Sequence, residues 1–234
     1  MNDEQPVSPS SMEMIQWTLG TPLQPGELGV MLAWAGVGKT ACLTHIAMEH
    51  LLQGLPVLHV CIDEIPDKIK VWYHEFLKNI SSVQPGENLA ALQHRIEPLR
   101  FILAYLHHTF SPDKLEQSLR NLKDQAGFHP SMVVLDGLDF DLAPRALIEE
   151  LRSVARKYAI SLWMSARAHR HITVTNDHGI PYPCHEIDDL FQEILLLEPA
   201  SNAIRLKALK QSGHYCSEHP TILLNPQTYL LQRE

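Results

Sequence analysis

Residues 29–40, GVMLAWAGVGKT, form the stretch that decides how the rest of this sequence is interpreted. The apolar residues 30–33 predict a buried strand, and a loop of small residues then closes on Gly38-Lys39-Thr40. From residue 41 to residue 52, apolar residues recur at helical spacing, which predicts a helix. A strand, a glycine loop and a helix in this order can hold phosphate, because the loop amides and the helix N-terminus favour an anion at one point.

The residues of this loop have distinct expected roles. Lys39 is expected to place its charge on the β- and γ-phosphates, and the hydroxyl of Thr40 is expected to ligate Mg²⁺. The expected ATP-binding residues are Ala35, Gly36, Val37, Gly38, Lys39, Thr40 and Ala41. The first glycine of the pattern G-x-x-x-x-G-K-[ST] is replaced by Ala33, so the turn there must use a conformation open to a residue with a Cβ.

Length and composition favour one α/β domain. The chain has 234 residues, of which 45% are hydrophobic, and we expect residues 1–15 to be a disordered tail and residues 16–234 to form a single domain. The formal net charge of -8 argues against a generally basic nucleic-acid surface. Four scattered cysteines without a CxxC motif fit a reducing compartment. With neither a signal-peptide pattern nor an apolar run of about 18 residues, the sequence predicts a cytoplasmic protein without a membrane span.

Residues 57–62 predict a second buried strand, which ends in Asp63-Glu64. In an open parallel sheet ligands bind beyond the carboxyl ends of the strands, so these carboxylates would lie near the phosphates if this strand neighbours the first. Glu64 could then orient or deprotonate an attacking water molecule. The alternative is that Glu64 caps the following helix. We favour catalysis, because Asp67 after Pro66 is expected to fill the cap position.

Residues 131–136, SMVVLD, predict a further buried strand that ends in an aspartate. Downstream of a phosphate loop, such a strand supplies the carboxylate on the Mg²⁺ side, and we assign this role to Asp136. Asp139 and Asp141 are expected to be solvated turn residues. The next strand, residues 159–166, brings Ser165 and the following Arg167 to the same edge, where either could sense the γ-phosphate.

Residues 167–187 form a long polar stretch rich in histidine, and loops of this length tend to be functional or mobile. It could contact DNA or a protein partner, although the net charge gives DNA no support. The histidines and the cysteine within residues 169–185 could instead hold a metal, but their spacing lacks the regularity of known zinc patterns. A flexible loop with solvated histidines is the third interpretation.

The remaining segments predict helices and closing strands. Helices are expected at residues 67–80, 89–96, 112–126 and 143–158, and a strand at residues 99–106. Three late strands, at residues 191–197, 203–209 and 221–224 with 229–231, have no helix between them. Antiparallel hairpins should therefore finish a mostly parallel central sheet flanked by helices.

This order of parts resembles the RecA-like P-loop ATPases, most closely the KaiC/DnaB/RadA branch, over nearly the whole chain from Gly20. The similar segments are PGELGVMLAWAGVGKT, VLHVCIDE, MVVLDGLD and SLWMSARAHR. The resemblance implies a RecA-like fold, ATP and Mg²⁺ as ligands, Glu64 as the catalytic glutamate, and a homo-oligomer that could be a ring. It also implies that the stretch SLWMSARAHR begins a DNA-contacting loop.

The late segment IRLKALKQSGHY resembles the hairpin whose K-x-R pair reaches the neighbour's γ-phosphate in such rings. Lys210 falls on the lysine of that pair, but Ser212 falls on the arginine, and an arginine finger is worth several orders of magnitude in rate. The sequence therefore leaves two functions open: an ATPase, or a nucleotide-binding regulatory module with little hydrolysis. A small-molecule kinase would need an arginine-rich lid, for which residues 167–187 hold too few arginines.

Overall fold

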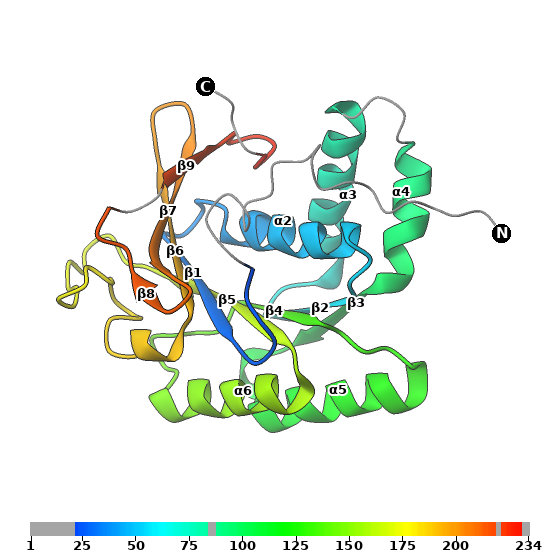
Figure 1. Ribbon diagram of the computed structural model, residues 1–234, viewed down its shortest axis with the longest axis horizontal. Helices are drawn as coiled ribbons and strands as arrows, with labels where there is room; N and C mark the ends of the chain where they lie inside the picture. Colours follow the sequence, from blue (N-terminus) through cyan, green and yellow to red (C-terminus); the bar gives the residue numbers. More distant parts are fainter. Residues whose placement is uncertain (1–21, 84–87, 219–220, 231–234) are drawn as a thin grey trace.

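The apolar runs of the sequence become the parallel strands of one sheet. The computed structural model describes residues 22–83, 88–218 and 221–230, so the tail expected at residues 1–15 lies outside the described residues. Six neighbouring strands run parallel, in the spatial order β3 (Arg100–Tyr105), β2 (Val57–Ile62), β4 (Met132–Asp136), β5 (Ser161–Arg167), β1 (Leu28–Ala33) and β6 (Glu193–Pro199). The expectation of an α/β fold with a mostly parallel sheet is confirmed (Figure 1).

Antiparallel strands finish the sheet, as expected. β7 (Ile204–Gln211) pairs with β6, and both β8 (His214–Tyr215) and β9 (Thr221–Leu224) pair with β7. The strand expected at residues 229–231 is wrong for the residues that the structure describes: Tyr229 and Leu230 follow a turn at residues 226–228 and belong to no strand, and residue 231 lies outside the described residues. β8 was not expected, because a two-residue strand leaves no periodic signal.

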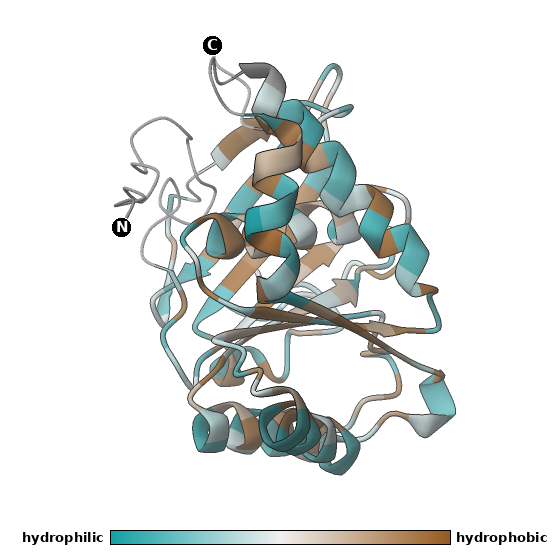
Figure 2. Ribbon diagram, turned by 90° about the vertical axis from the view of Figure 1, so that its right-hand side faces the viewer, coloured by the Kyte–Doolittle hydropathy of each residue, from teal (hydrophilic) through white to brown (hydrophobic). Residues whose placement is uncertain are grey.

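Helices cover both faces of the sheet (Figure 1). One layer contains α2 (Lys39–Leu52), α3 (Pro66–Val83) and α4 (Leu89–Ile96), and the other contains α5 (Pro112–Ala126) and α6 (Arg145–Tyr158). Figure 2 shows the sheet edge-on as a brown apolar layer, with the polar sides of α5 and α6 turned outward. Strands buried on both faces explain why β1, β2 and β4 were continuous apolar runs in the sequence.

Capping residues in the sequence predicted both ends of α5 correctly, but the predicted starts of α6 and β5 were wrong. The Oγ of Ser111 accepts a hydrogen bond from the Lys114 amide, and Gly127 adopts a left-handed φ of 60°, so both ends of α5 were predicted correctly. α6 begins at Arg145 and not at residue 143, because Pro144 has an extended backbone. Ala159 takes a left-handed φ of 51° and ends α6, so β5 begins at Ser161 and not at residue 159.

Two further features concern redox state and membranes. All four cysteines are free thiols. Cys42 and Cys61 are buried, as their apolar surroundings in the sequence predict, and Cys184 of the polar 167–187 segment is buried as well. Within the described part of the chain, no helix is both long and apolar enough to cross a membrane.

Glu193 is a buried carboxylic acid at the start of β6. Its Oε1 accepts a hydrogen bond of 2.7 Å from the amide of Ser212. Burial raises the pKa of Glu193 from 4.5 to about 7, against the lowering effect of that hydrogen bond, and the charge of Glu27 raises it further. The folded protein therefore favours the protonated acid.

We expect the free energy of unfolding to fall as the pH rises from about 4.5 to about 7, because the unfolded chain loses the Glu193 proton first. This fall in the free energy of unfolding should be on the order of 3 kcal/mol, and Glu193→Gln should remove it. Urea denaturation across this pH range measures the effect. Glu186→Gln, whose side chain is 84% exposed, is the matched control. Parallel pH profiles for Glu193→Gln and the wild type would contradict the assignment.

Candidate functional site

The glycine loop between β1 and α2 has the backbone that its sequence predicted. Gly36 and Gly38 have φ values of 80° and 110°, and Gly38 is the N-cap residue of α2. Ala33 is the buried last residue of β1 and is not among the residues with positive φ, so its Cβ causes no backbone strain. Alanine is therefore tolerated in place of the first glycine of the pattern, because this position belongs to the strand and needs no positive φ.

Thr40 and Asp136 meet under this loop. The Thr40 hydroxyl donates a hydrogen bond of 2.6 Å to Oδ2 of Asp136, at the carboxyl end of β4. The sequence predicted both residues as Mg²⁺ ligands, and the structure brings their oxygens together. Hydroxyl and carboxylate oxygens are the ligands that Mg²⁺ takes when phosphates complete its shell, so the pair fits this metal.

Strand order and alternation place the other candidates around this pair. β5 lies between β4 and β1, and Arg167 is paired in register with Ala33. Met132 and Val134 of β4 and Trp163 of β5 pack in the core on the α2 side. Because side chains alternate along a strand, Asp136, Ser165 and Arg167 belong to that same face.

Lys39 is half-buried within its own loop. Its Nζ donates to the carbonyl oxygen of Ala33 at 3.1 Å and to that of Trp34 at 3.4 Å. Burial lowers the pKa of Lys39, the nearby carboxylate of Asp136 raises it, and the charge of Arg167 lowers it again. Lys39, Asp136 and Arg167 are therefore close enough to act on one anion.

Ser165 has a structural partner. Its Oγ accepts a hydrogen bond of 3.0 Å from the amide of Gly137, directly after Asp136. Gly137 has a φ of 97°, and a Cβ there would lie 2.4 Å from the carbonyl oxygen of Ile62. Ser165 thus holds the turn after β4. Of the two candidates for γ-phosphate sensing, Arg167 is the one whose side chain is exposed.

Glu64 lies at the expected edge of the sheet, but two premises of its assignment are wrong. β2 is separated from β1 by β4 and β5, so its end does not neighbour the loop strand. Asp67 is not the N-cap, because α3 begins at Pro66 and the Asp67 carboxylate pairs with Lys70 at 2.9 Å. Glu64 forms an ion pair with Lys68, and this hydrogen bond is the main cause of its lowered pKa. Its catalytic role stays a prediction.

Lys210 does not point outward as a residue that reaches a neighbouring subunit would. It is 4% exposed, and its Nζ donates a hydrogen bond of 2.9 Å to the carbonyl oxygen of Asp188. The ammonium also lies 4.8 Å from the centre of the Tyr215 ring. Burial lowers the pKa of Lys210, which the charges of Asp188 and Asp189 partly offset.

The first residues of the segment 167–187 contact both sides of the site, while most of residues 171–179 are exposed. The amide of Ala168 bonds to the carbonyl oxygen of Ala33 at 2.9 Å, and the Arg170 guanidinium lies 4.7 Å from the centre of the Trp34 ring. Asp141 is an exposed turn residue, as expected, and its Oδ2 accepts a hydrogen bond of 2.7 Å from Nε2 of His169.

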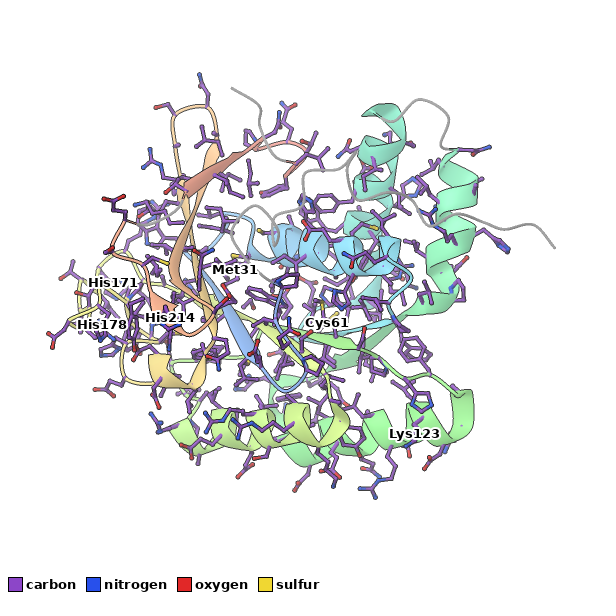
Figure 3. The ribbon with its side chains drawn as sticks, in the orientation of Figure 1. Met31, Cys61, Lys123, His171, His178 and His214 are labelled. Carbon is purple, nitrogen blue, oxygen red and sulfur yellow. The ribbon has the colours of Figure 1, made fainter. Side chains whose placement is uncertain are left out.

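The histidines of this segment do not form a metal cluster. His178 stacks on Tyr215 at 3.6 Å, and Figure 3 shows His171, His178 and His214 gathered beside β8, far from Met31 and Cys61 in the interior. Among the residues that the structure describes, no three His, Cys, Asp or Glu side chains converge as metal ligands would.

Tyr229 is a part of the site that sequence reasoning missed. Its ring packs on the glycine loop, and its hydroxyl lies 3.5 Å from the carbonyl oxygen of Val37. The Tyr229 carbonyl oxygen accepts a hydrogen bond of 2.9 Å from Nδ1 of buried His45, whose pKa burial lowers to about 4. The only local signal was the Asn225-Pro226 turn, which says nothing about where the turn docks.

Comparison with known proteins identifies no relative of this chain: no protein-family model matches the sequence, and no curated protein matches it significantly. The functional argument therefore depends on the geometry of the site.

Gly38→Ala should destabilise the protein by roughly 1–3 kcal/mol, because alanine is strained at a φ of 110° and its Cβ would lie 2.3 Å from the Tyr229 ring. Gly36→Ala is the matched control: it shares a positive φ, but nothing lies within 4 Å of its added Cβ. Tyr229→Ala in the Gly38→Ala background should lose less stability than the two single losses together. Denaturant unfolding of the full cycle measures this, and strict additivity would contradict the contact.

Proposed function

We propose that this chain is a RecA-like P-loop ATPase domain that binds ATP with Mg²⁺ between β1, β4 and the start of α2. The observation that carries the proposal is the hydrogen bond between Thr40 and Asp136 beneath a glycine loop that contains Lys39. A triphosphate with bound Mg²⁺ requires oxygen ligands for the metal and positive charge for the phosphates. Thr40 and Asp136, which contact each other, would supply the oxygens, and Lys39 at the helix N-terminus would supply the charge. The strand order, with β5 between β1 and β4, supports the same assignment.

In this proposal the chain's own groups divide the work. The amides of residues 36–40 and the Lys39 ammonium hold the β- and γ-phosphates. Thr40 and Asp136 would hold Mg²⁺, which supplies charge neutralisation on the phosphate oxygens when bound. Ser165 keeps the turn after Asp136 in place through Gly137, and Glu64 is the proposed group that positions the attacking water.

A nucleotide-binding regulatory module is the second candidate, and one observation favours it. Ser212 occupies the turn between β7 and β8 with a φ of 46°, and Lys210 is buried beside Asp188. This hairpin therefore offers a neighbouring subunit neither cation of the K-x-R pair. Assembly into a ring remains part of the proposal through the resemblance alone. We do not extend the proposal to DNA, because Arg170 is stacked on Trp34 and the net charge is -8.

Lys39→Ala and Asp136→Asn should each weaken Mg²⁺-dependent ATP binding by about 10- to 100-fold, the range for losing a charged hydrogen-bond partner. Titration of each purified variant with a fluorescent ATP analogue, with and without Mg²⁺, measures the affinities. Lys123→Ala is the control, because Lys123 is exposed on α5, on the other side of the sheet from α2 (Figure 3). Equal affinities for the wild type, both site variants and the control would remove the ATP-binding proposal.

For hydrolysis, we expect Glu64→Gln to bind ATP like the wild type but to turn it over more slowly, by about 10²-fold or more. Phosphate release under saturating ATP measures turnover, and Glu75→Gln on the following helix, α3, is the control. Tight ATP binding without turnover at any protein concentration would favour the regulatory module. Unchanged turnover in Glu64→Gln would remove Glu64 from the mechanism and leave the rest of the site in place.

A further inference from the structure

Neither position of the K-x-R pair offers a free cation to a neighbouring subunit in this chain. The Ser212 amide donates to Glu193, and Ser212 and Gly213 both have positive φ, which makes a tight two-residue turn. Lys210 is 4% exposed and held by Asp188 and Tyr215. Lys207, the other lysine of β7, forms an ion pair of 2.6 Å with Glu198. Neither Lys207 nor the two positions of the K-x-R pair therefore supplies a free charge for hydrolysis.

Arg167 is placed to supply that charge. It is the exposed last residue of β5, at the carboxyl edge between the ends of β1 and β4, and it pairs in register with Ala33 at the start of the loop. Alternation puts it on the α2 face, the same face as Asp136. Burial is the main cause of the lowered pKa of Lys39, and the nearby charge of Arg167 lowers it further.

The guanidinium of Arg167 is also not committed to another group. Within residues 22–83, 88–218 and 221–230 it makes no hydrogen bond and no ion pair. The nearby Arg170, in contrast, is stacked on Trp34 at 4.7 Å. An arginine at the mouth of an anion site, with a planar fork of donors and no competing partner, is suited to phosphate oxygens.

We propose that Arg167 is a catalytic residue that supplies, from within the same chain, the positive charge an arginine finger would otherwise bring from a neighbour. The inference rests on the proposed function. The water oxygen forms a bond to the γ-phosphorus, and the bond from that phosphorus to the β–γ bridging oxygen breaks. The electron pair leaves on the ADP oxygen, and the proton of the water passes to the released phosphate or to solvent. Arg167 stabilises the charge on the transferring oxygens during this step.

Two consequences distinguish a site completed within one chain from a site completed by a residue of a neighbouring subunit. Turnover per chain is independent of protein concentration, because no second chain completes the site. Arg167 also favours the transition state over the ground state, so its loss lowers kcat far more than ATP affinity. A residue that merely supported the fold would lower both.

The test compares wild type, Arg167→Ala, Arg167→Lys and the control Arg152→Ala, which lies beside Gly26 and Leu28 at the opposite end of β1. We expect Arg167→Ala to lower kcat by about 10³-fold and Arg167→Lys to recover only part of it, because lysine lacks the bidentate fork. The complex of ADP, aluminium fluoride and Mg²⁺ mimics the transition state. In Arg167→Ala, the affinity for this complex should fall at least about tenfold more than the affinity for a non-hydrolysable ATP analogue.

The outcomes distinguish this inference from the function on which it rests. Three results would each overturn the role of Arg167. The first is an equal loss of affinity for the transition-state mimic and for the ATP analogue in Arg167→Ala. The others are wild-type turnover in Arg167→Ala and turnover per chain that rises with protein concentration. ATP binding without any hydrolysis would overturn it as well, while leaving the nucleotide site intact. A wild-type protein that binds no ATP would overturn the proposed function and the inference together.

Discussion

The hydrogen bond between the Thr40 hydroxyl and the Asp136 carboxylate is the contact on which the rest of the site depends. It joins residues 96 positions apart, and it requires that α2 begin directly at the carboxyl edge of the sheet and that β4 present its last side chain to that helix. Core residues of β4 face both helical layers in alternation. A register slip of one residue would send Asp136 to the α5 and α6 side, so apolar packing fixes where this carboxylate points.

The glycine loop is held from outside as well as by its own sequence. Tyr229, close to the end of the described chain, packs on Gly38, and His45 of α2 anchors the Tyr229 carbonyl. Burial lowers the pKa of His45 to about 4, so the ring stays neutral near neutral pH and can donate its Nδ1 proton to that carbonyl. Helix α2, the glycine loop and the segment 225–230 therefore form one packed unit, and the backbone that would meet phosphate is supported on two sides.

Residues 167–187 follow β5 and contact three separate parts of the chain around the site. Arg170 contacts Trp34 of the glycine loop, His169 contacts Asp141 after β4, and His178 stacks on Tyr215 of the late hairpin. Three separate elements thus fix a segment that has no regular secondary structure. The same packing leaves the neighbouring Arg167 at the mouth of the site, while it holds Lys210 inside the hairpin.

The sequence by itself determined the alternation of strands and helices and the glycine loop, and it named Thr40 and Asp136 as candidates, because these depend on apolar periodicity, caps and local motifs along the chain. Only the tertiary structure decided that the two side chains meet. It could not determine that two strands separate β2 from β1, that the Gly137 amide bonds to Ser165, or that Tyr229 reaches the loop. Strand order and long-range docking are decided by how complete faces pack together. Strand order and docking depend on the free energy of packing the whole core, so no single segment of the sequence predicts them.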